Sequence, residues 1–125
     1  YRERIYGYIN IYETKAHVVH IGSASTGSRY NEFKVKYSGR NNIYLIYKNM
    51  PLVQIVLNLP FLATGFFIKI IFFYRKGLGR SYLEGLREGF AVCQKSNKVI
   101  YDKAHFLNYL KIQMELWVNV IRRFL

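Results

Sequence analysis

The residues best suited to chemistry lie near the N-terminus, where a run of small residues at 22–28 follows His20. Backbone N–H groups and hydroxyls in such a run can approach a phosphate closely. The imidazole of His20 could bind a metal ion, although its spacing from His17 does not easily bring both rings to one metal. The alternatives are an ordinary surface loop and a histidine that caps the preceding strand. The hydroxyls of this run include those of Ser23, Ser25 and Thr26.

A second candidate is the pair Arg40-Asn41, which begins 20 residues after His20. The planar guanidinium of an arginine donates two parallel hydrogen bonds to phosphate oxygens. The alternative role of Arg40 is an ion pair with Glu32 or Glu3.

Two predicted elements must position these residues. The β-prone run at 16–21 predicts a short strand that leads into the small-residue loop. Aromatic residues near a 3.6-residue period predict a helix over 30–49, interrupted at Gly39 and the three polar residues that follow it. Pro51 is expected to end this helix, because proline cannot continue the backbone hydrogen bonding.

The most hydrophobic segment is 51–74, whose 24 residues would be long enough to span a bilayer. Gln54, Asn58, Pro60 and Lys69 interrupt it. A lysine near the centre of a bilayer costs about 3 kcal/mol on insertion scales, and Gln54 and Asn58 share one helical face. We therefore expect two short helices, joined near Pro60, that lie in a membrane interface. The alternatives are a true span and burial against the rest of a larger protein.

The last part of the sequence predicts two further helices. Ser81 and Glu84 have the spacing of a capping box, which predicts a helix from Ser81 to about Lys95. Asp102 is expected to cap a terminal helix, whose apolar residues recur at spacings of three and four and form one stripe. We expect this stripe to pack on a partner helix, within the chain or in a dimer. Its members are Leu107, Leu110, Met114, Trp117, Ile121 and Phe124.

The composition excludes several classes of function. Asp102 is the only aspartate, so an aspartate pair or an Asp-x-Asp metal clamp cannot be completed within these residues. Cys93 is the only cysteine, which excludes an intrachain disulfide and a zinc site built from several cysteines. With 51% apolar and 18% aromatic residues, the chain is too hydrophobic for a disordered tail. We expect no self-contained acid–base enzyme and interpret the chain, which opens at Tyr1, as a piece of a longer protein.

The formal net charge is +12, from 19 Lys and Arg against 7 Asp and Glu. Such an excess suits nucleic acid, an anionic membrane surface or a phosphate-bearing small molecule as a partner. No run of Lys and Arg exceeds two residues, whereas the pairs Arg75-Lys76 and Arg122-Arg123 directly follow apolar stretches. This distribution is typical of a protein that binds a membrane surface, and we do not expect nucleic acid to be a partner.

Three elements together resemble the C-terminal end of family 2 glycosyltransferases: the run from His20 to Tyr30, the pair Arg40-Asn41, and Lys48-Asn49-Met50-Pro51. Within that family the chain is most similar to bacterial rhamnosyltransferase-type enzymes, which use dTDP-linked sugars to build polysaccharide. The likeness covers about residues 1–90. The joint spacing of the three elements is more specific than any one of them.

The resemblance implies transfer of a sugar from a nucleotide-sugar donor to a saccharide or polyprenyl-linked acceptor, at the cytoplasmic face of the bacterial inner membrane. It assigns His20 to a divalent metal, Mg or Mn, held together with upstream residues that this chain lacks, or to the donor diphosphate. Metal and guanidinium would stabilise the charge that develops on the departing diphosphate. The residues implied to contact donor or acceptor are Ser23, Ser25, Thr26, Arg40 and Asn41.

The resemblance also places the carboxylate base and the Asp-x-Asp motif of the family upstream of these residues. We therefore assign no catalytic residue to this chain and expect it to be inactive alone. The predicted fold is mostly α with a short N-terminal β segment: residues 1–50 would close an α/β GT-A catalytic domain, and 51–125 would form a helical membrane-associating region. The alternative function is a non-enzymatic basic module that binds a membrane surface or another helix.

Overall fold

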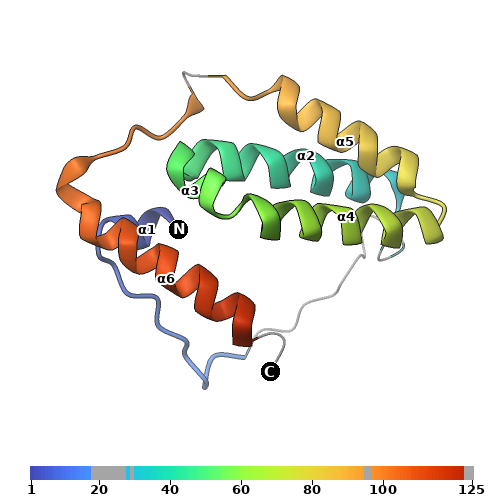
Figure 1. Cartoon of the computed structure of the whole chain (residues 1–125). Coiled ribbons are helices and arrows are strands. Elements are labelled where there is room, and N and C mark those ends of the chain that lie inside the picture. Colours follow the sequence, from blue (N-terminus) through green and yellow to red (C-terminus); the bar gives the residue numbers. More distant parts are fainter. Residues whose placement is uncertain (18–27, 29, 95–96, 123–125) are drawn as a thin grey trace. The chain divides into compact units, whose positions relative to one another are not determined.

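The computed structural model describes residues 1–17, 28, 30–94 and 97–122 (Figure 1). These residues form helices, turns and irregular segments, and none of them lies in a strand, so the mostly α class is confirmed. The chain divides into two compact units, one of residues 1–18 with 100–125 and one of residues 19–99. This division differs from the predicted boundary at residue 50, and the assignment of residues 1–50 to a GT-A domain stays a prediction.

The predicted strand falls mostly outside the described residues. Ala16 and His17 have no regular secondary structure, and residues 18–21 are not described. The N-terminal β segment and the GT-A fold therefore both stay predictions.

The larger unit is built on α2 (Glu32–Asn49) and α5 (Gly79–Ala91), which pack side by side (Figure 1). The side chain of Asn31 caps α2 by accepting a hydrogen bond from the backbone N–H of Lys34 at 2.8 Å. The helix ends before Pro51, as predicted. The predicted interruption at Gly39 is wrong, because this glycine is buried where the backbone of α5 approaches α2 and the helix runs through it.

Glycines on α5 allow the two helices to approach closely. A Cβ atom at Gly85 would lie 2.0 Å from the carbonyl oxygen of Lys36, and one at Gly89 would lie 2.8 Å from that of Arg40. The two glycines are four residues apart and share one face of the helix. Backbone atoms of α2 thus occupy the space that larger side chains would fill.

The apolar core of this unit lies where α2, α4 (Leu59–Arg75) and α5 meet. Val35 and Tyr82 are fully buried, and the ring of Tyr82 lies 4.9 Å from that of Phe73, measured between centroids. Partly buried apolar side chains surround these three residues, namely Phe66, Ile70, Leu78 and Leu86.

The hydrophobic segment forms two helices, α3 (Leu52–Leu57) and α4, as predicted, but only α3 is short, since α4 has 17 residues. The break lies at Asn58 rather than at Pro60. The Asn58 side chain donates a hydrogen bond to the carbonyl oxygen of Gln54 at 2.7 Å. Pro60 lies in the first turn of α4, where backbone N–H groups have no acceptor within the helix, so a residue without an N–H costs no hydrogen bond there. Within the described part of the chain, no helix is both long and apolar enough to cross a membrane.

The start of α5 corrects the predicted capping box. The helix begins at Gly79 and ends at Ala91, so Ser81 lies within its first turn and does not cap it. Gly77, with φ of 73°, makes a tight turn that starts the helix directly after α4. The carboxylate of Glu84 accepts a hydrogen bond from the Lys36 ammonium at 2.9 Å instead of closing the box.

The smaller unit packs α6 (Phe106–Arg122) on the short helix α1 (Arg2–Ile5). Its core consists of Ile5, Tyr109 and Ile112. The predicted cap is confirmed in modified form: Asp102 accepts a hydrogen bond from the backbone N–H of Ala104 at 2.9 Å and so caps the 3₁₀ turn η2 (Lys103–His105), which leads into α6.

The predicted apolar stripe of α6 is not the face that packs on α1. Leu107, Leu110 and Met114 are exposed, and the buried positions are Tyr109, Ile112 and Gln113. A hydrogen bond of 2.8 Å from the Asn108 side chain to the carbonyl oxygen of Ile5 helps to fix this orientation. The last member of the stripe, Phe124, lies outside the described residues.

Candidate functional site

Most of the predicted transferase residues lie outside the described residues. These are His20, Ser23, Ser25 and Thr26, so their grouping around a metal ion or a diphosphate stays a prediction. Among the residues that are described, no three His, Cys, Asp or Glu side chains lie close enough to hold a metal ion together.

The remaining pair, Arg40 and Asn41, lies on α2. The guanidinium carbon of Arg40 is 5.5 Å from the centroid of the Tyr37 ring, and Asn41 is exposed to solvent. The assignment of these two residues to the donor or acceptor stays a prediction. The alternative ion pair of Arg40 with Glu32 does not form within the described residues.

Cys93, just after α5, has the surroundings of a structural thiol. Its Sγ donates a hydrogen bond to the carbonyl oxygen of Gly89 at 3.1 Å. Burial raises the pKa of the thiol, which lowers the fraction of reactive thiolate.

The most distinctive feature is an exposed apolar surface formed by α3 and α4. In α3 the usual arrangement is inverted: Gln54 and the following Asn58 are each 5% exposed, whereas Val53 is 69% exposed. We call this the α3–α4 surface. Its exposed apolar residues are Leu52, Val53, Val56, Leu57, Leu59, Phe61, Phe67, Ile68, Ile71, Phe72 and Tyr74.

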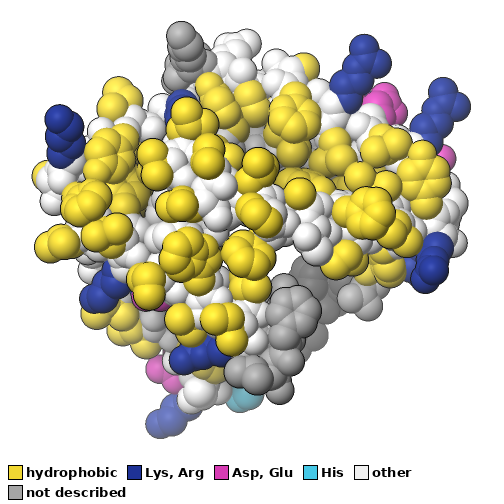
Figure 2. Space-filling model, viewed as in Figure 1, with side chains coloured by type: hydrophobic (Ala, Val, Ile, Leu, Met, Phe, Trp, Pro, Cys, Tyr) yellow, Lys and Arg dark blue, Asp and Glu magenta, His cyan; other side chains and the backbone are white. Residues whose placement is uncertain are grey.

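The helix α4 is apolar on both its inner and its outer side. Phe66, Ile70 and Phe73 pack into the core of the unit, while Phe67 and Ile68 are 62% and 60% exposed. A helix of a water-soluble domain normally carries apolar residues on only one face, and a helix apolar all round is normally covered by protein or lipid. Figure 2 shows hydrophobic side chains gathered over α3 and α4, with Lys and Arg side chains toward the edge of this area.

A cation lies beside the α3–α4 surface, in a stretch of sequence rich in basic residues. The ammonium of Lys76, just after α4, lies 5.3 Å from the ring centroid of Phe72 and 5.6 Å from that of Tyr30. Residues 33–83 include eight Lys or Arg and no Asp or Glu. Residues 19–99 hold 12 of the 19 Lys and Arg and 3 of the 7 acids, so 12 minus 3 gives +9 of the total charge of +12.

The sequence did not predict two features of this structure. The inverted burial of α3 was signalled by the spacing of Gln54 and Asn58, but the spacing alone does not say whether the polar face or the apolar face points outward. The contact of Lys76 with the Tyr30 ring has no signal in the sequence, because it depends on how the start of α2 meets the end of α4.

Searches with the whole chain match no family model, no curated protein and no solved structure.

Proposed function

We propose that this chain is the membrane-binding, C-terminal part of a family 2 glycosyltransferase and that its α3–α4 surface lies in the interface of an anionic membrane. The observation that carries the proposal is the apolar outer side of α4, with Phe67 and Ile68 exposed beside Lys69. A basic helix with exposed apolar residues binds at the boundary of headgroups and acyl chains, because apolar side chains leave water while cations stay near lipid phosphates.

In the enzyme we propose, this attachment serves the transfer reaction. An acceptor on a polyprenyl lipid is confined to the membrane, so a transferase held at the cytoplasmic face meets it without searching the bulk solution. The nucleotide-sugar donor and a divalent metal, Mg or Mn, would bind upstream, with His20 contributing to the metal site. Arg40 would contribute to the donor or acceptor site from α2, which is followed directly by α3.

Sugar transfer by the longer parent protein tests the enzymatic part of the proposal. The assay uses a panel of nucleotide sugars that includes dTDP-rhamnose, with a lipid-linked acceptor. We expect His20→Ala to abolish transfer while the protein stays folded, and we expect the matched control His17→Ala to keep most of the activity. If neither substitution changes the rate, the assignment of His20 to the metal site is wrong. If no donor is used at all, the transferase proposal itself is wrong.

A second candidate function is a helix-interaction module without enzymatic descent. It is favoured by the exposed stripe on α6, where Leu107 is 76% and Met114 58% exposed. Sedimentation of the chain tests this candidate. A dimer that Leu110→Glu converts to monomer would support it, and a monomer at every protein concentration would exclude self-association through the stripe.

A further inference from the structure

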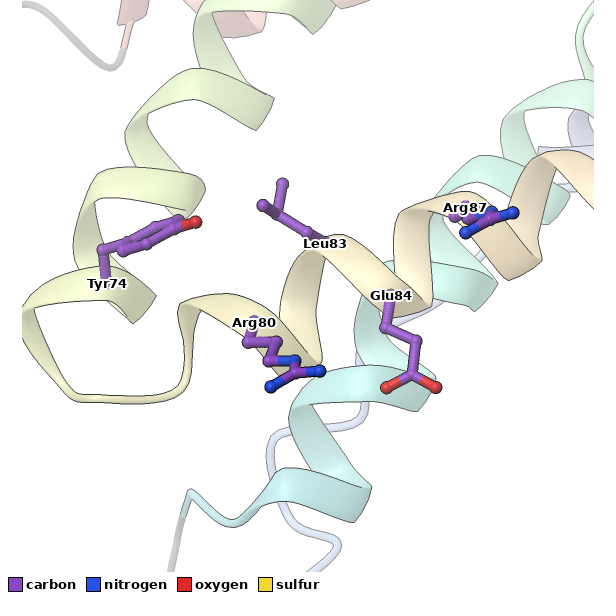
Figure 3. A pocket seen from close by; sticks show the side chains of 5 residues that line it. All are labelled: Tyr74, Arg80, Leu83, Glu84 and Arg87. Atoms are coloured by element: carbon purple, nitrogen blue, oxygen red, sulfur yellow. The ribbon is translucent and has the colours of Figure 1, made fainter.

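A pocket of about 450 Å³ lies between the end of α4 and the part of α5 from Arg80 to Arg87 (Figure 3). Tyr74 lines it from α4, and two arginines, a leucine and a glutamate line it from α5. In Figure 3 the Tyr74 side chain reaches from α4 toward α5, where the lining residues follow one another along the helix. These residues are Arg80, Leu83, Glu84 and Arg87.

The charged residues of the pocket lie on one face of α5, because the intervals from Arg80 to Glu84 and from Glu84 to Arg87 are four and three residues. The two arginines are seven residues apart, about 10.5 Å along the helix axis. Long arginine side chains can converge from this separation on a group held between them.

The acids of α5 are already paired with a cation of α2. The ammonium of Lys36 lies 2.9 Å from a carboxylate oxygen of Glu84 and 2.8 Å from one of Glu88. This pairing holds the pKa of the Glu84 carboxyl below its ordinary value, with Arg80 adding to the effect. Within the described residues, by contrast, neither Arg80 nor Arg87 forms an ion pair with a carboxylate. The guanidinium groups of both arginines can therefore bind an anion from outside the protein.

The pocket adjoins the α3–α4 surface, since Tyr74 belongs to both. Tyrosine side chains favour the headgroup level of a membrane, where the ring is partly buried and the hydroxyl stays hydrated. If the α3–α4 surface enters the interface, the pocket lies beside the lipid headgroups, because it shares Tyr74 with that surface. Arg75 and Lys76, at the turn between α4 and α5, add positive charge at the same end of α4.

We propose that this pocket binds the phosphate group of an anionic phospholipid, with the guanidinium groups of Arg80 and Arg87 donating hydrogen bonds to the phosphate oxygens. Arginine suits this role because its planar fork matches two oxygens of a phosphate. The inference rests on the proposed membrane binding and adds to it a defined headgroup site.

Flotation of the full chain with vesicles tests the site. One vesicle type contains phosphatidylcholine alone, and the other contains phosphatidylcholine with phosphatidylglycerol. The test variant is Arg80→Gln with Arg87→Gln. A matched control, Arg2→Gln with Lys15→Gln, removes the same charge at exposed positions of the smaller unit. A third variant, Arg80→Lys with Arg87→Lys, keeps the charge and removes only the guanidinium fork.

We expect the glutamine pocket variant to bind anionic vesicles about 30-fold more weakly than the unchanged chain, since each arginine near an anionic surface contributes about a factor of five. Binding to phosphatidylcholine alone should not change. The lysine variant should lose several-fold on anionic vesicles, and the control should lose far less than the pocket variant. Circular dichroism checks that every variant keeps its helices.

Equal losses in the pocket variant and the control would overturn the proposal, because binding would then follow net charge alone. Full retention of binding by the glutamine variant would overturn it as well, while membrane binding would stand. Failure of the unchanged chain to bind either vesicle would overturn both the site and the proposed membrane binding. Inorganic phosphate is the final probe: if it shifts the NMR signals of the arginine side chains without vesicles and competes fully with them, the ligand is free phosphate and not a lipid.

Discussion

Replacing Phe67 and Ile68 by serine removes the two large side chains that project most from the outer side of α4. Both lie on the α3–α4 surface, with exposed fractions of 62% and 60%. The core side of the helix is untouched, because Phe66 and Ile70 make the contacts there. The double variant is therefore expected to keep its fold and to bind lipid vesicles more weakly.

The size of the effect follows from the exposed area. Complete removal of a large apolar side chain from water is worth about 2.5 kcal/mol. With some three-fifths of each side chain still exposed in the free chain, membrane insertion gains about 1.5 kcal/mol from each. The double substitution should thus weaken binding by about 3 kcal/mol, or about 100-fold in the partition coefficient.

The assay is flotation with vesicles of phosphatidylcholine and phosphatidylglycerol at constant ionic strength. Ile9→Ser with Ile11→Ser is the matched control, because these residues are 85% and 89% exposed in a segment of the smaller unit that has no regular secondary structure. The control removes at least as much exposed apolar area, and we expect it to change binding by less than about threefold.

Two results would refute this reasoning. If the α4 variant partitions like the unchanged chain, the exposed apolar residues of α4 do not enter the lipid. If both variants lose binding equally, the membrane recognises exposed apolar area in general and not the α3–α4 surface. Far-ultraviolet circular dichroism must show unchanged helix content, since loss of the fold would also reduce binding.

Three further predictions concern stability. Gly85→Ala should destabilise the chain by about 3 kcal/mol, because the added Cβ would overlap the backbone of α2. Gly65→Ala should stabilise α4 by about 0.5–1 kcal/mol, because no atom outside the helix's own backbone lies within 4 Å of the added Cβ. Urea unfolding of both variants measures the contrast. Lys98→Met should cost about 2 kcal/mol in the same assay, since the ammonium donates hydrogen bonds to the carbonyl oxygens of Tyr47, in the last turn of α2, and of Met50, which caps it, at 2.8 and 3.1 Å. The pKa of Glu84 is lowered in the folded chain, chiefly by its hydrogen bond with Lys36. The ionised carboxylate therefore contributes fully to the free energy of unfolding above the unfolded-state pKa, and this contribution disappears as the pH falls through the folded-state pKa. The melting temperature should accordingly fall less steeply below about pH 4.5 in Glu84→Gln than in the unchanged chain, and parallel curves would contradict this account.

The features that the sequence predicted correctly depend on local chemistry. Pro51 ends α2 because of its own ring, and Asp102 caps the next N–H groups along the chain. The two-helix form of the hydrophobic segment likewise follows from polar residues within it. The capping box at Ser81 was a wrong prediction: α5 begins two residues earlier, at Gly79, and the Glu84 carboxylate accepts a hydrogen bond from Lys36 of α2.

The features that could not be predicted depend on contacts between distant segments. The stripe from Leu107 onward has regular helical spacing, but Ile5 decides which face of α6 is buried, and nothing in the spacing reveals that choice. The role that we give Arg80 and Arg87 depends on the turn at Gly77, which sets the end of α4 against α5. For His20 and the small-residue loop, the resemblance remains the source of the assignment.

The uneven distribution of charge links folding to the environment of the protein. A unit that holds +9 of the net charge, with only 3 acids, is opposed in its compact state by repulsion among its own cations. Salt reduces this repulsion by screening, and a layer of anionic lipid would reduce it more by supplying counterions at fixed positions. The proposed membrane would then act as a folding ligand: the chain should melt at a higher temperature on anionic vesicles than in dilute buffer, in proportion to how tightly it binds them.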